Sequence, residues 1–225
     1  MTFSPLQLLR PRQLPEGIYV EIISDLFSAT PSIVVFLVSQ CVIGTVIFIE
    51  TGDHYILALT LIAVLVSAER IWMIRRYHRT AAGRKLPRDE AAAWERQFAI
   101  RSIATAIVVS AIGVRCFMLQ DPAVHMLIIG MISTYAAGTV TRVAYRPRLA
   151  LINLFIVAVP PSIACMLHGG LIYISLGLIT LIFLFGAFDI IQHAYATAVS
   201  QLTLKRKFAG LAQQDALYHV HRNTM

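Results

Sequence analysis

The sequence predicts an all-α integral membrane protein, a six-transmembrane-helix bundle with both termini in the cytoplasm. Of its 225 residues, 57% are hydrophobic and 14% are charged, and the mean hydropathy is +0.71. An ordinary soluble domain carries about 25% charged residues. Six apolar runs each approach the roughly 20 residues that a helix needs to cross hydrocarbon. Lysine and arginine collect in alternate loops between these runs.

The six predicted spans are joined by connections of two kinds. In chain order the spans cover residues 32–49, 55–74, 99–119, 123–140, 149–167 and 171–191. The connections after the first, third and fifth spans are only a few residues long, with the sequences ETGD, QDP and HGG. Such short loops join antiparallel neighbours, so the spans are expected to pair as three hairpins.

The distribution of positive charge predicts the orientation of the spans. The three short loops contain no lysine or arginine. The basic residues lie instead in the second and fourth connections and after the sixth span: Arg75, Arg76, Arg79, Arg84, Lys85, Arg88, Arg96, Arg142, Arg146, Arg148, Lys205, Arg206 and Lys207. Because positive loops stay on the cytoplasmic side, both termini are predicted to be cytoplasmic.

An N-terminal segment, residues 1–30, precedes the first span. Its stretch EGIYVEIISDLFSATP contains an apolar stripe, with three polar residues on the opposite face. The stripe consists of Ile18, Tyr19, Ile22, Ile23, Leu26 and Phe27, and the polar residues are Glu21, Asp25 and Ser28. This pattern predicts an amphipathic helix at the cytoplasmic interface. The acidic face is unusual for binding anionic lipid, so packing against the basic loop is an alternative.

Two further local features concern the membrane domain, residues 31–191. Asp89 and Glu90 follow Pro87 and predict a short helix that runs into the third span. Pro160 and Pro161 remove two backbone donors from the fifth span, which predicts a kink there.

The last segment, residues 192–225, is expected to continue the sixth span as a cytoplasmic exit helix. Gly210 is its sole glycine, and it contains no proline. Residues with a 4-3-4-3 spacing recur along it: Ile191, Tyr195, Ala198, Leu202, Lys205, Ala209 and Ala212. This spacing is compatible with a loose dimer seam. A single helix leaving the membrane explains it equally well, because clean heptads are few.

Charged residues within the spans are the candidate functional residues. Glu69 and Arg101 are predicted to form an ion pair between the second and third spans. Asp189, near the inner end of the sixth span, would find a partner in Arg142 or Arg148 and so hold the exit helix. Each of these pairs would fit either a switch or a static bridge.

Arg115 lies near the outer end of the third span, at the level of three acidic residues, Glu50, Asp53 and Asp121. One interpretation is an ion pair with one of these carboxylates. The other is a site for an anionic ligand.

Neither metal nor nucleic acid is predicted as a partner. The seven histidines include no pair with convincing ligand spacing, and the three cysteines form no Cys-x-x-Cys pair. The net charge of +7 reflects the cytoplasmic loops of a membrane protein rather than a surface for nucleic acid. Small residues in the fourth and sixth spans indicate a tightly packed bundle.

The phrase LAQQDAL near the end of the chain resembles the junction that precedes the catalytic domain of GGDEF-type diguanylate cyclases. Leu211, Ala212, Asp215 and Leu217 match the first half of that junction, whereas YHVH stands where Thr-Gly-Leu-x is expected. WERQFAIRS and YAAGTVTRVAYRPRLA are similar to stretches of the membrane region of such cyclases from proteobacteria.

This resemblance implies a membrane sensor or anchor in the bacterial inner membrane, one that regulates a cytoplasmic GGDEF output domain and works as a homodimer. The family condenses two GTP molecules into cyclic di-GMP. The present chain contains no Gly-Gly-Asp/Glu-Glu-Phe segment, so it is not expected to be an enzyme by itself. A small six-span transporter or channel is the alternative function, although the spans show neither a dense polar face nor a clear inverted repeat.

Overall fold

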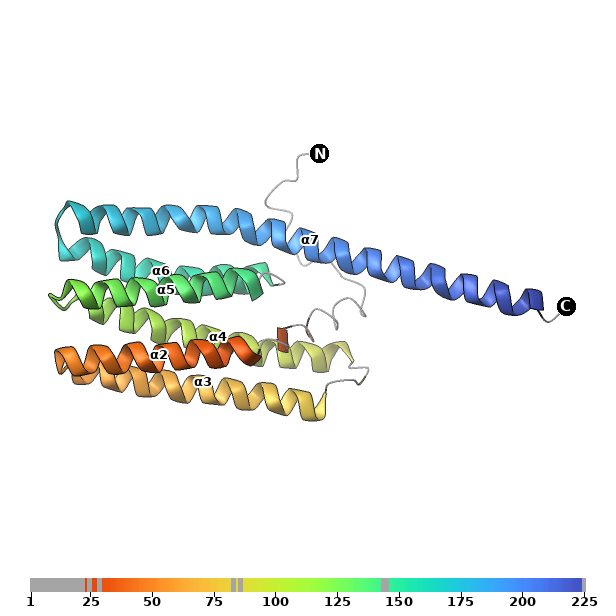
Figure 1. Ribbon diagram of the computed structural model, residues 1–225, viewed down its shortest axis with the longest axis horizontal. Helices are drawn as coiled ribbons and strands as arrows, with labels where there is room; N and C mark the ends of the chain where they lie inside the picture. The colour runs from red at the N-terminus through yellow and green to blue at the C-terminus, as the bar shows by residue number, and fades with distance from the viewer. Residues whose placement is uncertain are drawn as a thin grey trace.

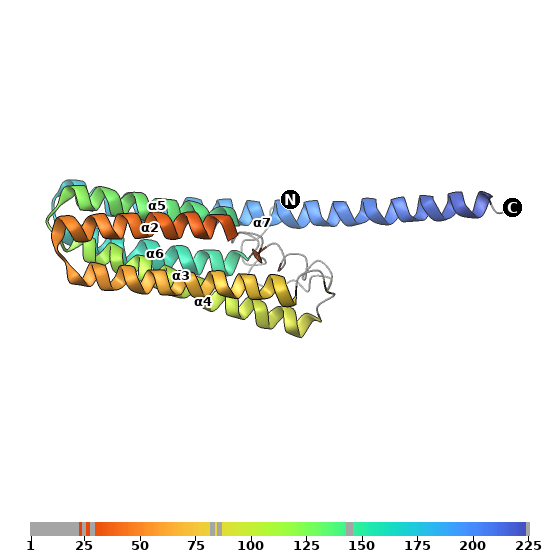
Figure 2. The ribbon, with the colours of Figure 1, turned by 60° about the horizontal axis from the view of Figure 1, so that its bottom comes forward.

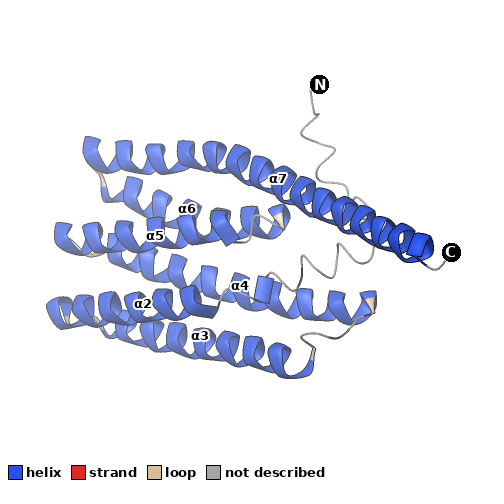
Figure 3. Cartoon of the chain, turned by 45° about the vertical axis from the view of Figure 1, so that its right-hand side comes forward, coloured by secondary structure: helices blue, strands red, loops and turns tan. Residues whose placement is uncertain are grey.

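The computed structural model describes the backbone of residues 23, 26, 27, 30–81, 84, 87–142 and 146–223. The side chains of residues 30–32, 141–142, 198–199, 202–203 and 205–223 lie outside this description. All regular structure in the described residues is helical (Figure 3). The helices are α2 (Thr30–Thr51), α3 (His54–Thr80), α4 (Arg88–Phe117), α5 (Pro122–Arg142), α6 (Pro147–His168) and α7 (Leu171–Asn223).

Six helices are long and apolar enough to cross a membrane, in agreement with the six predicted spans. The candidate membrane segments are Ile33–Thr51, His54–Thr80, Arg88–Phe117, Pro122–Val140, Pro147–His168 and Leu171–Thr197. The connections between the helices distinguish the two ends of the bundle. The α2–α3, α4–α5 and α6–α7 connections lie together at what we call the short-loop end (Figure 1). The end of α3 and the start of α4 lie at the opposite end, which we call the basic end because they carry Arg75, Arg76, Arg79 and Arg88.

Helix α4 contacts α3, α5 and α6 and so links the α2–α3 hairpin to the rest of the bundle. In the view of Figure 1 the α2–α3 hairpin and α7 lie at opposite sides of the bundle, and Figure 2 shows α4 beside α3. The contact between α4 and α6 is one of the two most extensive in the molecule, the other being between α6 and α7. The second and third predicted hairpins, α4–α5 and α6–α7, are therefore held together by an interface between helices that are not neighbours in sequence.

Close packing of α4 on α6 depends on a glycine. A Cβ atom built on Gly113 would lie 2.9 Å from Cγ of Pro161. Pro161 is buried at this contact, and α6 remains one helix from Pro147 to His168 across both prolines. The small residue thus allows the helix that carries the bulky proline ring to approach.

Helices α3 and α4 extend beyond the predicted spans at the basic end. The helix predicted to start near Asp89 is part of α4, which runs unbroken from Arg88 to Phe117. The two extensions are joined by an aromatic cluster that includes Tyr77 and Trp94, whose ring centroids lie 5.4 Å apart in an edge-on arrangement.

The described part of the N-terminal segment packs on the extended ends of α3 and α4, which we call the α3–α4 hairpin. Ile23, Leu26 and Phe27 are buried, and the Phe27 ring stacks on Tyr77 with centroids 3.9 Å apart. His78 Nε2 lies 3.0 Å from the Phe27 carbonyl oxygen. These three residues therefore contact protein rather than lipid. The rest of the predicted amphipathic helix lies outside the described residues.

Helix α7 differs from the others in length and exposure. It continues without a break from Leu171 to Asn223 and projects well past the basic end of the bundle (Figure 1). Within its candidate span only 11% of the most apolar window is buried. The helix thus lies at the edge of the bundle and packs mainly on α6.

Candidate functional site

The start of α7 is held by a group of polar and aromatic side chains at the short-loop end. Here the C-terminus of α4, the first turn of α5, the last turn of α6 and the first turn of α7 meet. His125 comes from α5, His168 from α6 and Tyr173 from α7. We call these three residues the α7 clamp.

His125 connects α7 to the end of α4 through both ring nitrogens. Its Nε2 lies 3.1 Å from the carbonyl oxygen of Cys116 and 2.9 Å from that of Leu119. Because both partners are acceptors, Nε2 carries the hydrogen and donates. Nδ1 lies 2.8 Å from the Tyr173 hydroxyl oxygen and is hydrogen-bonded to it. The side chain is 2% exposed.

His168 makes an equivalent contact from α6. Its Nδ1 lies 3.1 Å from the carbonyl oxygen of Phe117 and donates to it. Its ring lies 4.4 Å from the ring of Tyr173 and 4.9 Å from that of His125, centroid to centroid. The last carbonyls of a helix have no partner within the helix. The two histidines bond two of these carbonyls, those of Cys116 and Phe117, and so tie α5, α6 and α7 to the end of α4.

A groove of about 790 Å³ opens beside this clamp, between the end of α4 and the second half of α6. Apart from Gln120 and His168, its lining side chains are apolar: Val114, Phe117, Met118, Pro160, Ile163, Ala164 and Leu167. In a bilayer such a groove would be filled by acyl chains or by another apolar molecule. It therefore offers a route by which the lipid environment reaches His168.

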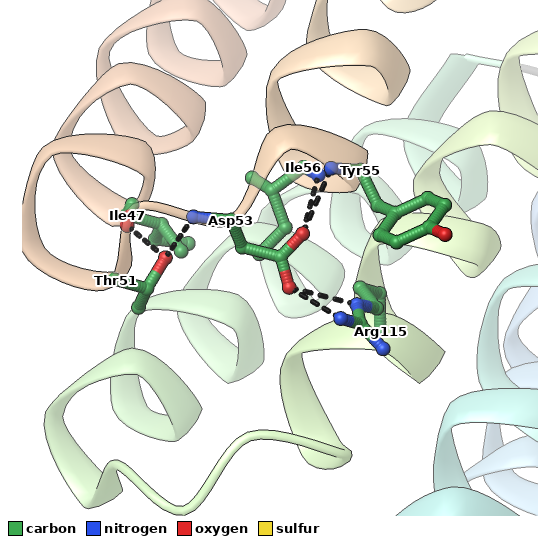
Figure 4. A network of polar contacts seen from close by, with 6 residues as sticks. All are labelled: Ile47, Thr51, Asp53, Tyr55, Ile56 and Arg115. Atoms are coloured by element: carbon green, nitrogen blue, oxygen red, sulfur yellow. Dashed lines mark hydrogen bonds and ion pairs between the residues drawn. The ribbon is translucent and has the colours of Figure 1, made fainter.

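A second polar group at the short-loop end fixes the α2–α3 connection (Figure 4). Asp53 caps α3 by accepting hydrogen bonds from the backbone N–H groups of Tyr55 at 2.8 Å and Ile56 at 3.3 Å. Its other carboxylate oxygen accepts from Nε of Arg115 at 2.9 Å and lies 2.6 Å from Nη2. The Arg115 guanidinium also lies over the Tyr55 ring, 5.0 Å from its centroid.

Arg115 thus takes one of the two predicted roles. Of the three acidic residues at its level, the structure pairs it with Asp53, whose side chain is 6% exposed. Burial by itself raises the pKa of Asp53. The hydrogen bonds from Arg115, Tyr55 and Ile56, together with the charge of Arg115, outweigh burial, so the pKa of Asp53 lies below its usual value of 3.8. The pair holds the first hairpin against α4 and neutralises the arginine that an anionic ligand would need.

Toward the basic end, the structure brings Glu69 and Arg101 together. Arg101 Nη2 lies 2.7 Å from Glu69 Oε1. A pair that the sequence analysis did not identify, Glu95 with Arg146, lies at the same end with an Oε1–Nε distance of 2.9 Å. It joins the first part of α4 to the residue preceding α6. Both pairs are partly exposed, and such pairs contribute little to stability, about 0–1 kcal/mol.

Asp189 has a different partner from those predicted. Its Oδ1 lies 3.3 Å from Nδ1 of His193, one turn further along α7, and both side chains are largely exposed. Two partners were predicted for Asp189, Arg142 and Arg148. Among the described side chains, Arg148 forms no ion pair with Asp189. The side chain of Arg142 lies outside the description.

Polar groups also meet in the middle of the bundle. Asn153 Nδ2 donates to Ser102 Oγ at 2.8 Å, which joins α6 to α4, and the Tyr135 hydroxyl donates to the Ser102 carbonyl oxygen at 3.4 Å. All three residues are buried. A lone asparagine in an otherwise apolar span is a sequence signal for such an interhelical bond. Asn153 carries this signal, because it is the only asparagine within the predicted spans.

The junction residues Leu211, Ala212, Asp215 and Leu217 belong to the distal part of α7. Their backbone is helical, and their side chains lie outside the description. Among the described residues, no group of three or more histidine, cysteine or acidic side chains is arranged to hold a metal ion.

Comparisons with protein-family profiles, curated proteins and solved structures found no match for this chain.

Proposed function

We propose that this chain is the membrane sensor or anchor module of a cyclic di-GMP signalling protein in the bacterial inner membrane. In this proposal the basic end faces the cytoplasm. The α7 helices of two copies lie together and pass a signal from the bundle to a GGDEF output domain. The chain itself supplies no catalytic group.

The unbroken course of α7 is the observation that carries the proposal. The candidate span ends at Thr197, whereas the helix ends at Asn223, about 40 Å further along its axis at 1.5 Å per residue. Most of the stability of a helix in a protein comes from packing of one of its faces against other structure. Pairing with a second copy would stabilise α7, and the distal part carries the residues that resemble the junction of the cyclase family.

The α7 clamp gives the signal a place to enter. Tyr173 lies in the first turn of α7 and is bonded to His125 of α5, so a change at the ends of α4, α5 or α6 bears directly on α7. A differential of about 1–3 kcal/mol between two arrangements is enough for regulation. A pair of long helices would convert this differential into a change in their register or separation.

A fusion experiment tests the proposal. A complete GGDEF domain is attached after Asn223, and cyclic di-GMP formation is measured in membranes. Insertion of one to seven alanines after Ser200 rotates the distal helix by about 100° per residue. We expect activity to fall most after two or five insertions, which turn the distal helix by about 200° and 140°. It should return after seven, because a paired helix repeats every seven residues.

Two controls separate failure of the proposal from failure of the fused domain. The same GGDEF domain on an independent dimeric coiled coil should be active. The variant Tyr173→Phe, which loses a single hydroxyl, should change the activity of the full fusion. Activity that is independent of both the insertions and Tyr173 would refute signal transmission through α7. Selective solute flux in proteoliposomes would instead support the transporter alternative.

A further inference from the structure

The last two turns of α3 have two chemically different faces. Met73, Ile74 and Tyr77 are buried and face the bundle. Trp72, Arg75, Arg76 and Arg79 are exposed and lie within about 100° of one another on the opposite face, at 100° per residue. We call these four residues the arginine stripe.

The residues that precede the stripe on the same face are those of a lipid-facing helix. Leu61 and Leu65 are 56% and 69% exposed. Trp72, about two turns beyond Leu65 toward the basic end, is 58% exposed. Tryptophan is enriched at the boundary between hydrocarbon and headgroups. Between Leu65 and Trp72 lies Glu69, which is 54% exposed and is paired with Arg101 of α4. The change from leucine to tryptophan to arginine therefore places the edge of the hydrocarbon near Trp72, with the Glu69–Arg101 pair about one turn inside it.

The three arginines then lie at the depth of the lipid headgroups. Arg79 is about 10 Å beyond Trp72 along the helix axis, and the headgroup region of one leaflet is about 5–7 Å thick. The backbones of Arg75 and Arg76 fall inside this layer. That of Arg79 lies about 3–5 Å outside it, so Arg79 reaches the headgroups only through its long side chain. Within the part of the chain that the structure describes, no carboxylate forms an ion pair with these three arginines. The Arg76 guanidinium contacts the Trp72 ring, 5.7 Å from its centroid.

We propose that the arginine stripe binds the headgroup of an anionic phospholipid. Three unpaired guanidinium groups at phosphate depth provide the charge, and each has planar N–H donors that match phosphate oxygens. Trp72 provides the contact with the upper acyl chain. The lipid would hold the α3–α4 hairpin at the membrane surface, on the side opposite to the face that packs on Phe27.

Quenching of Trp72 by brominated lipid tests this proposal. The chain has two tryptophans, and Trp94→Phe leaves Trp72 as the sole indole. The variant is reconstituted into phosphatidylcholine vesicles that contain a fixed fraction of phosphatidylglycerol, with bromine on the acyl chains of one lipid or the other. Relative quenching reports which lipid is enriched beside Trp72. Native mass spectrometry of lipid adducts on the wild-type chain provides a second measurement that does not depend on Trp94→Phe.

A matched pair of double variants separates the stripe from general positive charge. Arg75→Gln with Arg79→Gln removes two stripe charges, whereas Arg84→Gln with Arg148→Gln removes two exposed charges from outside it. Each arginine near an anionic surface strengthens association by about fivefold. We expect the first pair to reduce the preference for phosphatidylglycerol by about tenfold or more, and the second pair by less than about twofold.

Three results would overturn the inference. Equal quenching by the two brominated lipids in the parent protein would mean that no anionic lipid gathers at Trp72. An unchanged preference after loss of Arg75 and Arg79 would place the lipid elsewhere. Equal losses from the two double variants would show that total charge, and not the stripe, determines the enrichment.

Discussion

At the scale of single residues, Asp53 shows how one side chain combines two tasks. One carboxylate oxygen caps α3, and the other holds Arg115 of α4. The sequence placed three acidic residues at the level of Arg115 but did not distinguish among them. Counting residues along a helix gives the depth of each residue in the membrane. Which of the three carboxylates, Glu50, Asp53 or Asp121, contacts Arg115 depends instead on how the helices pack against one another.

The lowered pKa of Asp53 leads to a pH-dependent prediction. Asp53→Asn keeps a capping oxygen but removes the charge that faces Arg115, which we expect to lower the free energy of unfolding by about 1–3 kcal/mol at pH 7. The folded-state pKa lies below the ordinary 3.8, so this contribution is complete above about pH 5 and is lost as the pH falls through the folded-state pKa. Thermal unfolding of the two proteins in detergent, measured from pH 8 to pH 3, checks it.

Asp121→Asn is the control for this prediction. Asp121 Oδ1 accepts from the backbone N–H of Ala123 at 2.8 Å, and the described residues show no arginine bonded to it. Its substitution should cost much less and show little dependence on pH. If the two variants lose the same stability at every pH, the ion pair with Arg115 contributes nothing measurable.

At the scale of helices, the contact between α6 and α7 depends on one glycine. A Cβ atom on Gly177 would lie 2.4 Å from Cγ of Met166 and 2.9 Å from the Ser162 carbonyl oxygen, whereas a Cβ atom on Gly186 would meet nothing within 4 Å. We expect Gly177→Leu to separate the two helices and cost about 1–3 kcal/mol or more. Gly186→Leu, on the same helix, should be nearly neutral. Melting temperatures of the two variants, compared in one detergent, decide the point.

The N-terminal segment and the α3–α4 hairpin also depend on a single contact. Phe27 is 0% exposed and stacks on Tyr77. We expect Phe27→Ala to destabilise the protein by about 3–5 kcal/mol, the usual cost of removing a buried phenylalanine. Phe155→Ala, on a residue that is 61% exposed, is the matched control and should change the melting temperature far less. Similar effects from both variants would mean that Phe27 is not packed in solution as it is in the structure.

The spans themselves were predictable, because each is an unbroken apolar run bounded by charge or by a short polar loop. The ends of α3 and α4 at the basic end were harder to predict. Their extensions contain several arginines, and hydropathy alone ends the span at Ile74, whereas the helix continues to Thr80. What stabilises the extra turns is the cluster of Phe27, Tyr77 and Trp94, whose members are far apart in sequence.

At the scale of the whole molecule, the prediction concerns sidedness. Glu50 and Gln120 are exposed at the short-loop end, and Arg84 is exposed at the basic end. If the six helices cross the bilayer as proposed, cysteines at Glu50 and Gln120 react with an impermeant maleimide added to intact cells, and a cysteine at Arg84 reacts only after lysis. The native Cys116 and Cys165 are buried, whereas Cys41 is partly exposed, so the three new cysteines are introduced into a Cys41→Ser background. Labelling of all three sites from one side would exclude this topology.

The order of the helices across the bundle was the least predictable feature. Short loops indicated three hairpins, but nothing in the sequence indicated that α4 would pack on α6. That contact depends on the fit of Gly113 against Pro161 and on the bond between Ser102 and Asn153, which are complementary pairs rather than patterns within one helix.

The peripheral position of α7 has a mechanical consequence. A rigid rod held near one end amplifies small rotations at its free end. If α7 tilts on α6 by about 5°, the tip, about 40 Å beyond the bilayer, moves sideways by about 3 Å. That displacement is comparable to the spacing between neighbouring side chains, so a minor rearrangement among the anchoring rings would be large where a docked domain meets the tip.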